Sequence, residues 1–132
     1  MGISEKAVKY HENGFNCCQA VFAACSELTG VDEKTALSIG SGFGGGLRCG
    51  EVCGSLSGAV MALSAAMPYN DSDDIEAKTK IAALTKQCCS CFREKFGTVV
   101  CRELLSGKSF DICDEFIAYA AELAERIIEE NK

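Results

Sequence analysis

Apolar residues recur at helical spacing along most of the chain, and no segment shows the two-residue alternation of a half-buried strand. The clearest stripe is formed by Val21, Phe22, Cys25 and Leu28, which are three or four residues apart. A second stripe begins at Ile112 and continues to the end of the chain. The pattern therefore predicts an all-α protein.

Capping and helix-breaking residues divide the chain into about five to seven predicted helices, which we expect to form a compact single-domain bundle over residues 1–132. Glycine or proline follows most of these segments, as is typical of helix ends. The predicted helices run from Ser4 to Asn13, from Cys17 to Leu28, from Asp32 to Ile39, from Glu51 to Met67, from the acidic stretch Asp71–Asp74 to Phe96, from Thr98 to Leu105, and from Ser109 or Asp111 to the C-terminal end.

A glycine-rich loop is predicted before the central helix. Five of the seven residues in Gly40–Gly46 are glycines, and no regular element tolerates that density. The segment Glu51–Met67 that follows is almost uncharged, so we expect it to be the buried central helix. Within it, Gly54 and Gly58 form a small-residue face that favours close packing of another helix.

The glycine loop formally matches the dinucleotide fingerprint, but no strand precedes it and no βαβ unit surrounds it. A dinucleotide site is therefore not predicted. The backbone amides of Gly44, Gly45 and Gly46 would instead cradle an anion or the sulfurs of a cluster, or the loop is simply a tight turn.

Composition and charge exclude several classes of protein. A chain of 132 residues with 48% hydrophobic residues can bury a core without disulfide bonds. The net charge of −6 comes without a basic face, so nucleic-acid binding is not expected. No apolar run approaches the ~18–20 residues that span a membrane, and the first residues do not resemble a signal peptide. We therefore expect a cytoplasmic protein with reduced thiols.

Ten cysteines dominate the candidate chemistry. Cys17, Cys53, Cys101 and Cys113 each fall at the beginning of a predicted helix. Unpaired N–H groups and the helix dipole at such ends lower the pKa of a thiol, which favours metal binding or electron exchange. If these helix beginnings converge, they would form a four-thiolate metal site or two exchangeable dithiols.

The other cysteines are weaker candidates. Cys88 and Cys91 lie one helical turn apart in a CxxC pair, and Cys49 lies beside the glycine loop, so these three are secondary metal ligands or redox thiols. Cys25 belongs to the buried stripe and is expected in the core. Cys18 and Cys89 carry no assignment.

The only histidine, His11, is predicted on a polar surface, although a Cys–His nucleophile pair would have to use it. No Cys-x-x-Cys-His motif occurs, which excludes covalent attachment of a c-type haem.

Four motifs occur along the chain in a characteristic order. They are the NCxQAV-like segment Phe15–Val21, the glycine segment Gly42–Gly46, the GEVCG segment Gly50–Ala59, and the FG…CREL segment Phe96–Leu105 followed by Cys113. Together they resemble the redox-active C_GCAxxG_C_C family over almost the whole chain.

The resemblance implies a small helical protein whose four characteristic cysteines would be Cys17, Cys53, Cys101 and Cys113. The family is described as redox-active without a defined reaction. Related domains in split-Soret cytochromes suggest a homodimer and an iron–sulfur centre. This chain departs from the family pattern at Ser55, where the pattern has alanine, and in its extra cysteines.

Three functions stay open on the sequence. The first is a metal-binding redox protein that holds an iron–sulfur cluster, which the resemblance favours, or zinc through four thiolates, and that exchanges electrons with a redox partner protein. The second is a metal-free thiol–disulfide oxidoreductase or redox sensor. The third is a non-catalytic helical scaffold with cysteines packed in its core.

Overall fold

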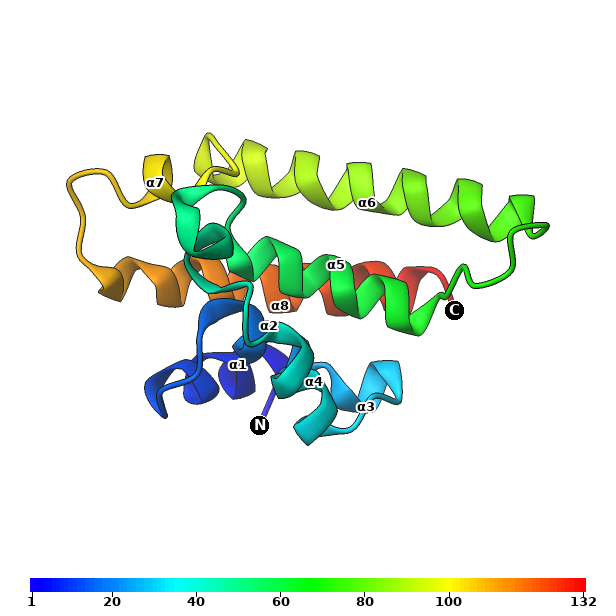
Figure 1. Cartoon of the computed structure of the whole chain (residues 1–132), viewed down its shortest axis with the longest axis horizontal. Helices are drawn as coiled ribbons and strands as arrows, with labels where there is room; N and C mark the ends of the chain where they lie inside the picture. The colour runs from blue at the N-terminus through cyan, green and yellow to red at the C-terminus, as the bar shows by residue number, and fades with distance from the viewer.

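Eight α-helical segments make up the bundle in the computed structural model, which describes residues 1–132 (Figure 1). The all-α prediction is confirmed, and the helix count is slightly higher than predicted because the segment after Asn16 breaks at Cys25 into two helices. The segments are α1 (Ile3–Glu12), α2 (Cys17–Ala24), α3 (Ser26–Thr29), α4 (Glu33–Gly40), α5 (Gly54–Ala66), α6 (Ile75–Phe96), α7 (Cys101–Leu104) and α8 (Cys113–Glu130), with two short turns at Gly46–Gly50 (η1) and Phe110–Ile112 (η2).

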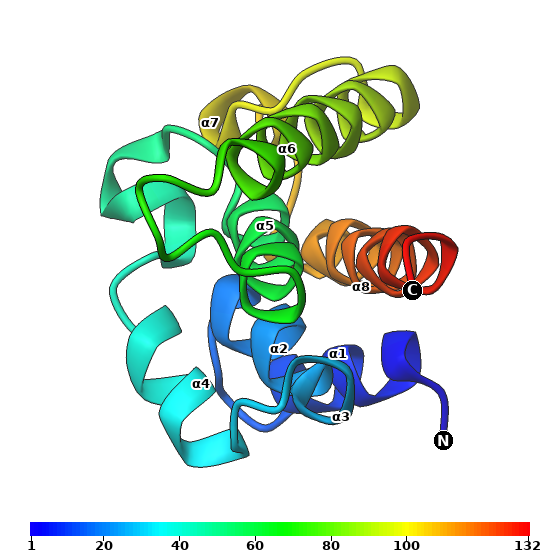
Figure 2. The same cartoon turned by 90° about the vertical axis from the view of Figure 1, so that its right-hand side faces the viewer.

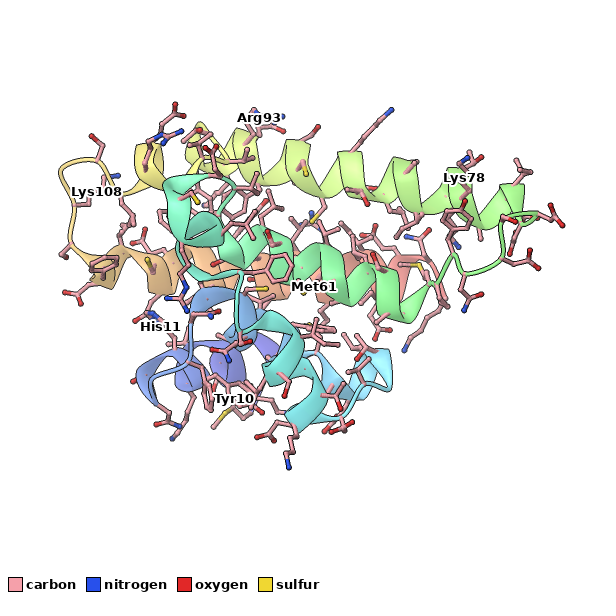
Figure 3. The ribbon with its side chains drawn as sticks, in the orientation of Figure 1. Tyr10, His11, Met61, Lys78, Arg93 and Lys108 are labelled. Carbon is pink, nitrogen blue, oxygen red and sulfur yellow. The ribbon has the colours of Figure 1, made fainter.

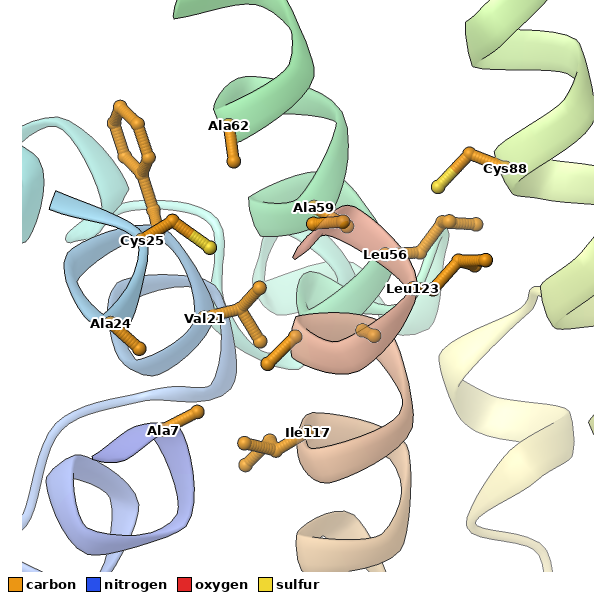
Figure 4. Packing of buried hydrophobic residues seen from close by; sticks show 14 of the residues in the cluster. Ala7, Val21, Ala24, Cys25, Leu56, Ala59, Ala62, Cys88, Ile117 and Leu123 are labelled. Atoms are coloured by element: carbon orange, nitrogen blue, oxygen red, sulfur yellow. The ribbon is translucent and has the colours of Figure 1, made fainter. Parts of the chain in front are cut away.

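The helix α5 occupies the centre of the bundle, as its uncharged sequence predicts. It packs against α2, α6 and α8, and the end view in Figure 2 shows α6 on one side of it and α2 on the other. Leu56 and Ala59 of α5 face Val21 of α2 and Leu123 of α8 in the hydrophobic core (Figure 4). This core stabilises the fold by removing apolar area from water. None of the helices is long and apolar enough to cross a membrane.

Two glycines of α5 allow α2 to approach closely. A Cβ atom on Gly58 would lie 2.8 Å from the Cys18 carbonyl oxygen, and one on Gly54 would overlap the Cys17 sulfur. A contact of 2.8 Å is shorter than real Cβ contacts, so α2 would have to move. The predicted small-residue face thus packs against the backbone of α2, and this contact places Cys17 beside the beginning of α5.

The glycine-rich segment forms a left-handed turn rather than a helix. Gly45, Gly46, Leu47 and Arg48 have consecutive positive φ angles of 64°, 61°, 60° and 61°. Only glycine adopts this conformation without cost, so the turn is strained at Leu47 and Arg48. A Cβ on Gly46 would also lie 2.5 Å from the Glu51 backbone nitrogen, which fixes this turn against the segment that carries Cys53.

The central helix begins three residues later than predicted. Glu51–Cys53 is not helical, and Val52 forms an isolated antiparallel bridge with Val100. The prediction of a helix from Glu51 is wrong because these residues pair with a distant segment, whereas the helical hydrogen bonds start at Gly54. The predicted helix from Thr98 likewise shrinks to the single turn α7.

Candidate functional site

Four thiols from distant segments line one cavity of about 300 Å³ at one end of the bundle. Cys17, Cys101 and Cys113 are the first residues of α2, α7 and α8, and Cys53 directly precedes α5. The cavity therefore lies where four helices begin. The four cysteines that the sequence analysis placed at helix beginnings are brought together in space.

The backbone bridge between Val52 and Val100 positions two of the thiols. The Cys53 N–H donates to the Val99 carbonyl at 2.8 Å, and the Cys101 N–H donates to the Glu51 carbonyl at 2.5 Å. Because side chains alternate along extended backbone, Cys53 and Cys101 lie on the same side of this bridge. An ion pair of 3.3 Å between Arg102 and Glu51 spans the two segments.

Cys17 is positioned by the N-terminal cap of α2. The Asn16 side chain accepts a hydrogen bond from the Gln19 N–H, and the Gln19 side chain accepts one from the Asn16 N–H, which completes a capping box. The Asn16 amide also donates to the Ser41 carbonyl at 3.1 Å. A single side chain thus joins the beginning of α2 to the glycine-rich segment.

The glycine segment contributes two of its three predicted residues to the site. Gly44 and Gly45 line the cavity, while Gly46 packs against Glu51 instead. A Cβ on Gly44 would lie 2.5 Å from the Asn16 Cβ, so the backbone approaches the cap of α2 too closely for any other residue. Arg48 of the same segment also lines the cavity and brings a positive charge to it.

Burial outweighs the effect of the helix beginnings on thiol acidity. Burial, followed by the charges of neighbouring cysteines, raises the pKa of Cys53 to about 11 and that of Cys113 to about 12. It raises the pKa of Cys101 as well. N–H groups of Ser55 and Leu56 at the beginning of α5 lower the pKa of Cys53, but by less. The expectation of acidic thiols at these helix ends is therefore wrong for Cys53, Cys101 and Cys113.

Cys113 interacts with each of the other three thiols. The charges of Cys17, Cys53 and Cys101 all raise its pKa, and Asp114 adds to the effect. Such mutual repulsion shows that the four sulfurs share one electrostatic environment.

All ten cysteines are free thiols. No group of three or more His, Cys, Asp or Glu side chains is arranged to hold a metal ion.

The secondary candidates lie away from the cavity. Cys49 is exposed in η1, and its thiol donates to the Leu47 carbonyl. Cys88 is a fully buried residue of α6. The Cys91 sulfur lies 4.0 Å from an Arg126 guanidinium nitrogen. None of these three sulfurs lines the four-cysteine cavity.

Two further cysteines serve the core. Cys25 and Cys18 are fully buried, and the Cys18 thiol lies 3.6 Å from the Met61 sulfur. The core position predicted for Cys25 is confirmed.

The sequence analysis missed several residues that line the cavity, among them His11, Arg48 and Ser55. His11 lines the cavity, and its Nδ1 lies 2.8 Å from an Asp114 carboxylate oxygen, beside the start of α8 (Figure 3). The prediction of a surface histidine is wrong because α1 packs along α8 and half-buries the imidazole. The two partners are 103 residues apart, and neither residue belongs to a recognisable motif.

A family model described as "Putative redox-active protein (C_GCAxxG_C_C)" matches residues 15–127 of the chain. The chain belongs to this family. The matched region contains all four cavity cysteines, the glycine segment and the bridge between Val52 and Val100. Comparison with curated proteins and with solved structures finds no match. This C_GCAxxG_C_C protein therefore shares with its family the segments that form the four-cysteine cavity.

The core thiols give a prediction on stability. Burial raises the pKa values of Cys18, Cys25 and Cys88 to about 12 from an ordinary value near 9. Below pH 9 the folded and unfolded chains both hold these protons. At higher pH the unfolded chain loses them first, so the free energy of unfolding falls until about pH 12. We expect a loss of about 1.4 kcal/mol per pH unit for each such thiol.

Urea unfolding at pH 7.5 to 10.5 under an excess of reductant measures this slope. The Cys25→Ala variant serves as the comparison, because it removes one buried thiol from the core. Its stability should depend less steeply on alkaline pH. Equal slopes for both proteins would contradict the assignment of a neutral, buried Cys25.

Proposed function

We propose that this C_GCAxxG_C_C protein is an electron-transfer protein whose thiolates of Cys17, Cys53, Cys101 and Cys113 hold an iron–sulfur cluster. The observation that carries the proposal is the convergence of these four thiols on one cavity. Four cysteine thiolates are the usual ligand set of such clusters. When bound, the cluster would supply one-electron chemistry.

The electrostatics of the cavity favour a metal over free thiolates. Ionising the four thiols without a cation is costly, because burial and mutual repulsion raise the pKa values of Cys53, Cys101 and Cys113. The cationic side chain that lines the cavity is Arg48, and the imidazole of His11 is paired with Asp114. A metal centre offsets the negative charge of all four sulfurs at once, since metal binding displaces the thiol protons.

The size of the cavity favours a cluster over a single zinc ion. About 300 Å³ is far more space than one ion needs, and a tetrahedral zinc site requires all four sulfurs at about 2.3 Å from one point. A cluster has several metal atoms, so its ligands are spread over a larger volume. Thiols that come from the beginnings of four different helices suit this arrangement better.

The chain's own residues would protect and tune such a centre. Leu104, Leu105 and Phe116 supply apolar walls, and burial of this kind influences the reduction potential of a centre. The N–H groups at the beginning of α5 stabilise negative charge on Cys53. Phe110 lines the mouth and is 75% exposed, which leaves one side of the cavity close to solvent.

Metal-free thiol exchange is the weaker proposal on this geometry. The attacking species in that reaction is a thiolate, and raised pKa values keep Cys53 and Cys113 protonated near neutral pH. A scaffold whose cysteines only fill the core would explain Cys25 and Cys88. It would not explain why four cysteines share one cavity. A redox partner protein and a homodimer stay predictions.

Anaerobic purification, followed by iron, sulfide and zinc analysis and an absorption spectrum, tests the proposal. We expect iron and acid-labile sulfide in the protein, before or after reconstitution, with a visible band that bleaches on reduction. If the protein stays colourless after reconstitution and binds stoichiometric zinc, the site is a zinc site and not a cluster site. A metal-free protein that forms one discrete disulfide on mild oxidation would favour thiol exchange.

A further inference from the structure

The hydroxyl of Ser55 is a buried polar group without a partner. Ser55 lies in the first turn of α5, is 0% exposed and lines the four-cysteine cavity. Among buried side-chain oxygen and nitrogen atoms, its Oγ is the one that forms no hydrogen bond. An unsatisfied hydroxyl costs free energy in a protein interior, so its presence calls for a role.

The surroundings of Ser55 point to sulfur as its partner. Cys53 lies two residues before it and faces the same cavity. The Ser55 hydroxyl lies close enough to the Cys53 sulfur to lower its pKa, as do the N–H groups of Ser55 and Leu56. A neutral thiol is a weak acceptor, whereas a thiolate is a strong one. The unpartnered hydroxyl therefore gains a strong acceptor when the Cys53 sulfur holds a metal.

We propose that the Ser55 hydroxyl donates a hydrogen bond to the Cys53 thiolate in the loaded protein and thereby raises the reduction potential of the centre. The inference rests on the proposed function, because the thiolate is the one that holds the cluster. Hydrogen bonds to ligand sulfur withdraw negative charge and favour the reduced, more negative state of a cluster. Ser55 is a positioning and tuning residue that does not itself coordinate metal.

Alanine is smaller than serine, so Ser55→Ala removes the hydroxyl and creates no new clash in the packed first turn of α5. The variant therefore removes the hydrogen bond and leaves the packing of α5 unchanged. Ser57→Ala is the matched control, since Ser57 lies on the same helix, is only partly buried and does not line the cavity.

Redox titration of the reconstituted protein is the first arm of the test. We expect a lower midpoint potential for Ser55→Ala, such that the ratio of reduced to oxidised centre at the wild-type midpoint falls about three- to tenfold. Ser57→Ala should titrate as the wild type does. Equal potentials for all three proteins would overturn the proposal while the proposed function stands.

Alkylation of Cys53 in the metal-free protein is the second arm, and it does not require a cluster. A small alkylating reagent at fixed pH, followed by peptide mass spectrometry, reports the thiolate fraction of this cysteine. We expect labelling of Cys53 to slow about threefold or more in Ser55→Ala, and to be unchanged in Ser57→Ala. If labelling slows but the wild type loads no cluster, the hydrogen bond stands and the proposed function fails. Unchanged labelling overturns the donor role of Ser55.

Discussion

Loss of a single cavity thiol is expected to abolish the centre. In Cys113→Ser we expect metal content after reconstitution to fall to less than about a tenth of the wild-type value, because a serine hydroxyl is a poor ligand for soft metals. Cys113 is the most informative position, since its thiol interacts electrostatically with Cys17, Cys53 and Cys101. Iron and sulfide analysis with the visible spectrum measures the loss.

The control for this experiment is Cys91→Ser. Cys91 is partly buried on α6, as Cys113 is at the start of α8, but it does not line the four-cysteine cavity. We expect this variant to load the centre as the wild type does. If Cys91→Ser loses the centre while Cys113→Ser keeps it, the ligand set belongs to the CxxC pair on α6, and the cavity assignment is wrong.

The beginning of α2 and the end of α6 could be predicted because local chemistry determines them. Asn16 and Gln19 form a capping box from side chains three residues apart, and Gly97 ends α6 with a positive φ of 89°. Both signals are visible in a short stretch of sequence. The capping box placed Cys17 at the beginning of α2, whereas α8 begins at Cys113 without a side-chain cap, directly after the turn η2.

The contacts that assemble the site could not be predicted in the same way. The bridge between Val52 and Val100 joins segments 48 residues apart in the sequence numbering, and each contributes only one paired residue. A strand of that length has no detectable alternation. The valine before Cys53 and the two valines before Cys101 are the sole hint of extended backbone. His11 reached the site through packing of α1 on α8, which no motif records.

The acidity of the thiols depends on two effects of opposite sign, and only one of them is visible in the sequence. A helix beginning lowers a thiol pKa, and the sequence shows where helices begin. Burial raises it, and burial depends on the whole fold. For Cys53 the N–H groups of α5 are present and burial still dominates, so its pKa rises to about 11. Helix position alone therefore predicts the place of these thiols but not their charge.

The contact between α2 and α5 predicts a large loss of metal binding in Gly54→Ala, a variant that keeps all ten cysteines. In Gly54→Ala the new methyl group overlaps the Cys17 sulfur and lies 3.0 Å from the Phe43 carbonyl oxygen. The thiol or the whole of α2 must move, so we expect metal content after reconstitution to fall at least about tenfold. Overpacking should also lower the free energy of unfolding by about 1–3 kcal/mol, partly offset by the better helix propensity of alanine.

Two further glycine variants separate the effect on the site from the effect on the fold. In Gly58→Ala the methyl group meets the Cys18 carbonyl oxygen at 2.8 Å and no cavity thiol, so we expect lower stability with the centre retained. In Gly42→Ala nothing lies within 4 Å of the methyl group, and both properties should stay at wild-type values. Urea unfolding and metal analysis of the three variants measure both effects. If Gly54→Ala loads as much metal as Gly42→Ala, the sulfur of Cys17 is not held in place by this glycine, and its role as a ligand loses its structural basis.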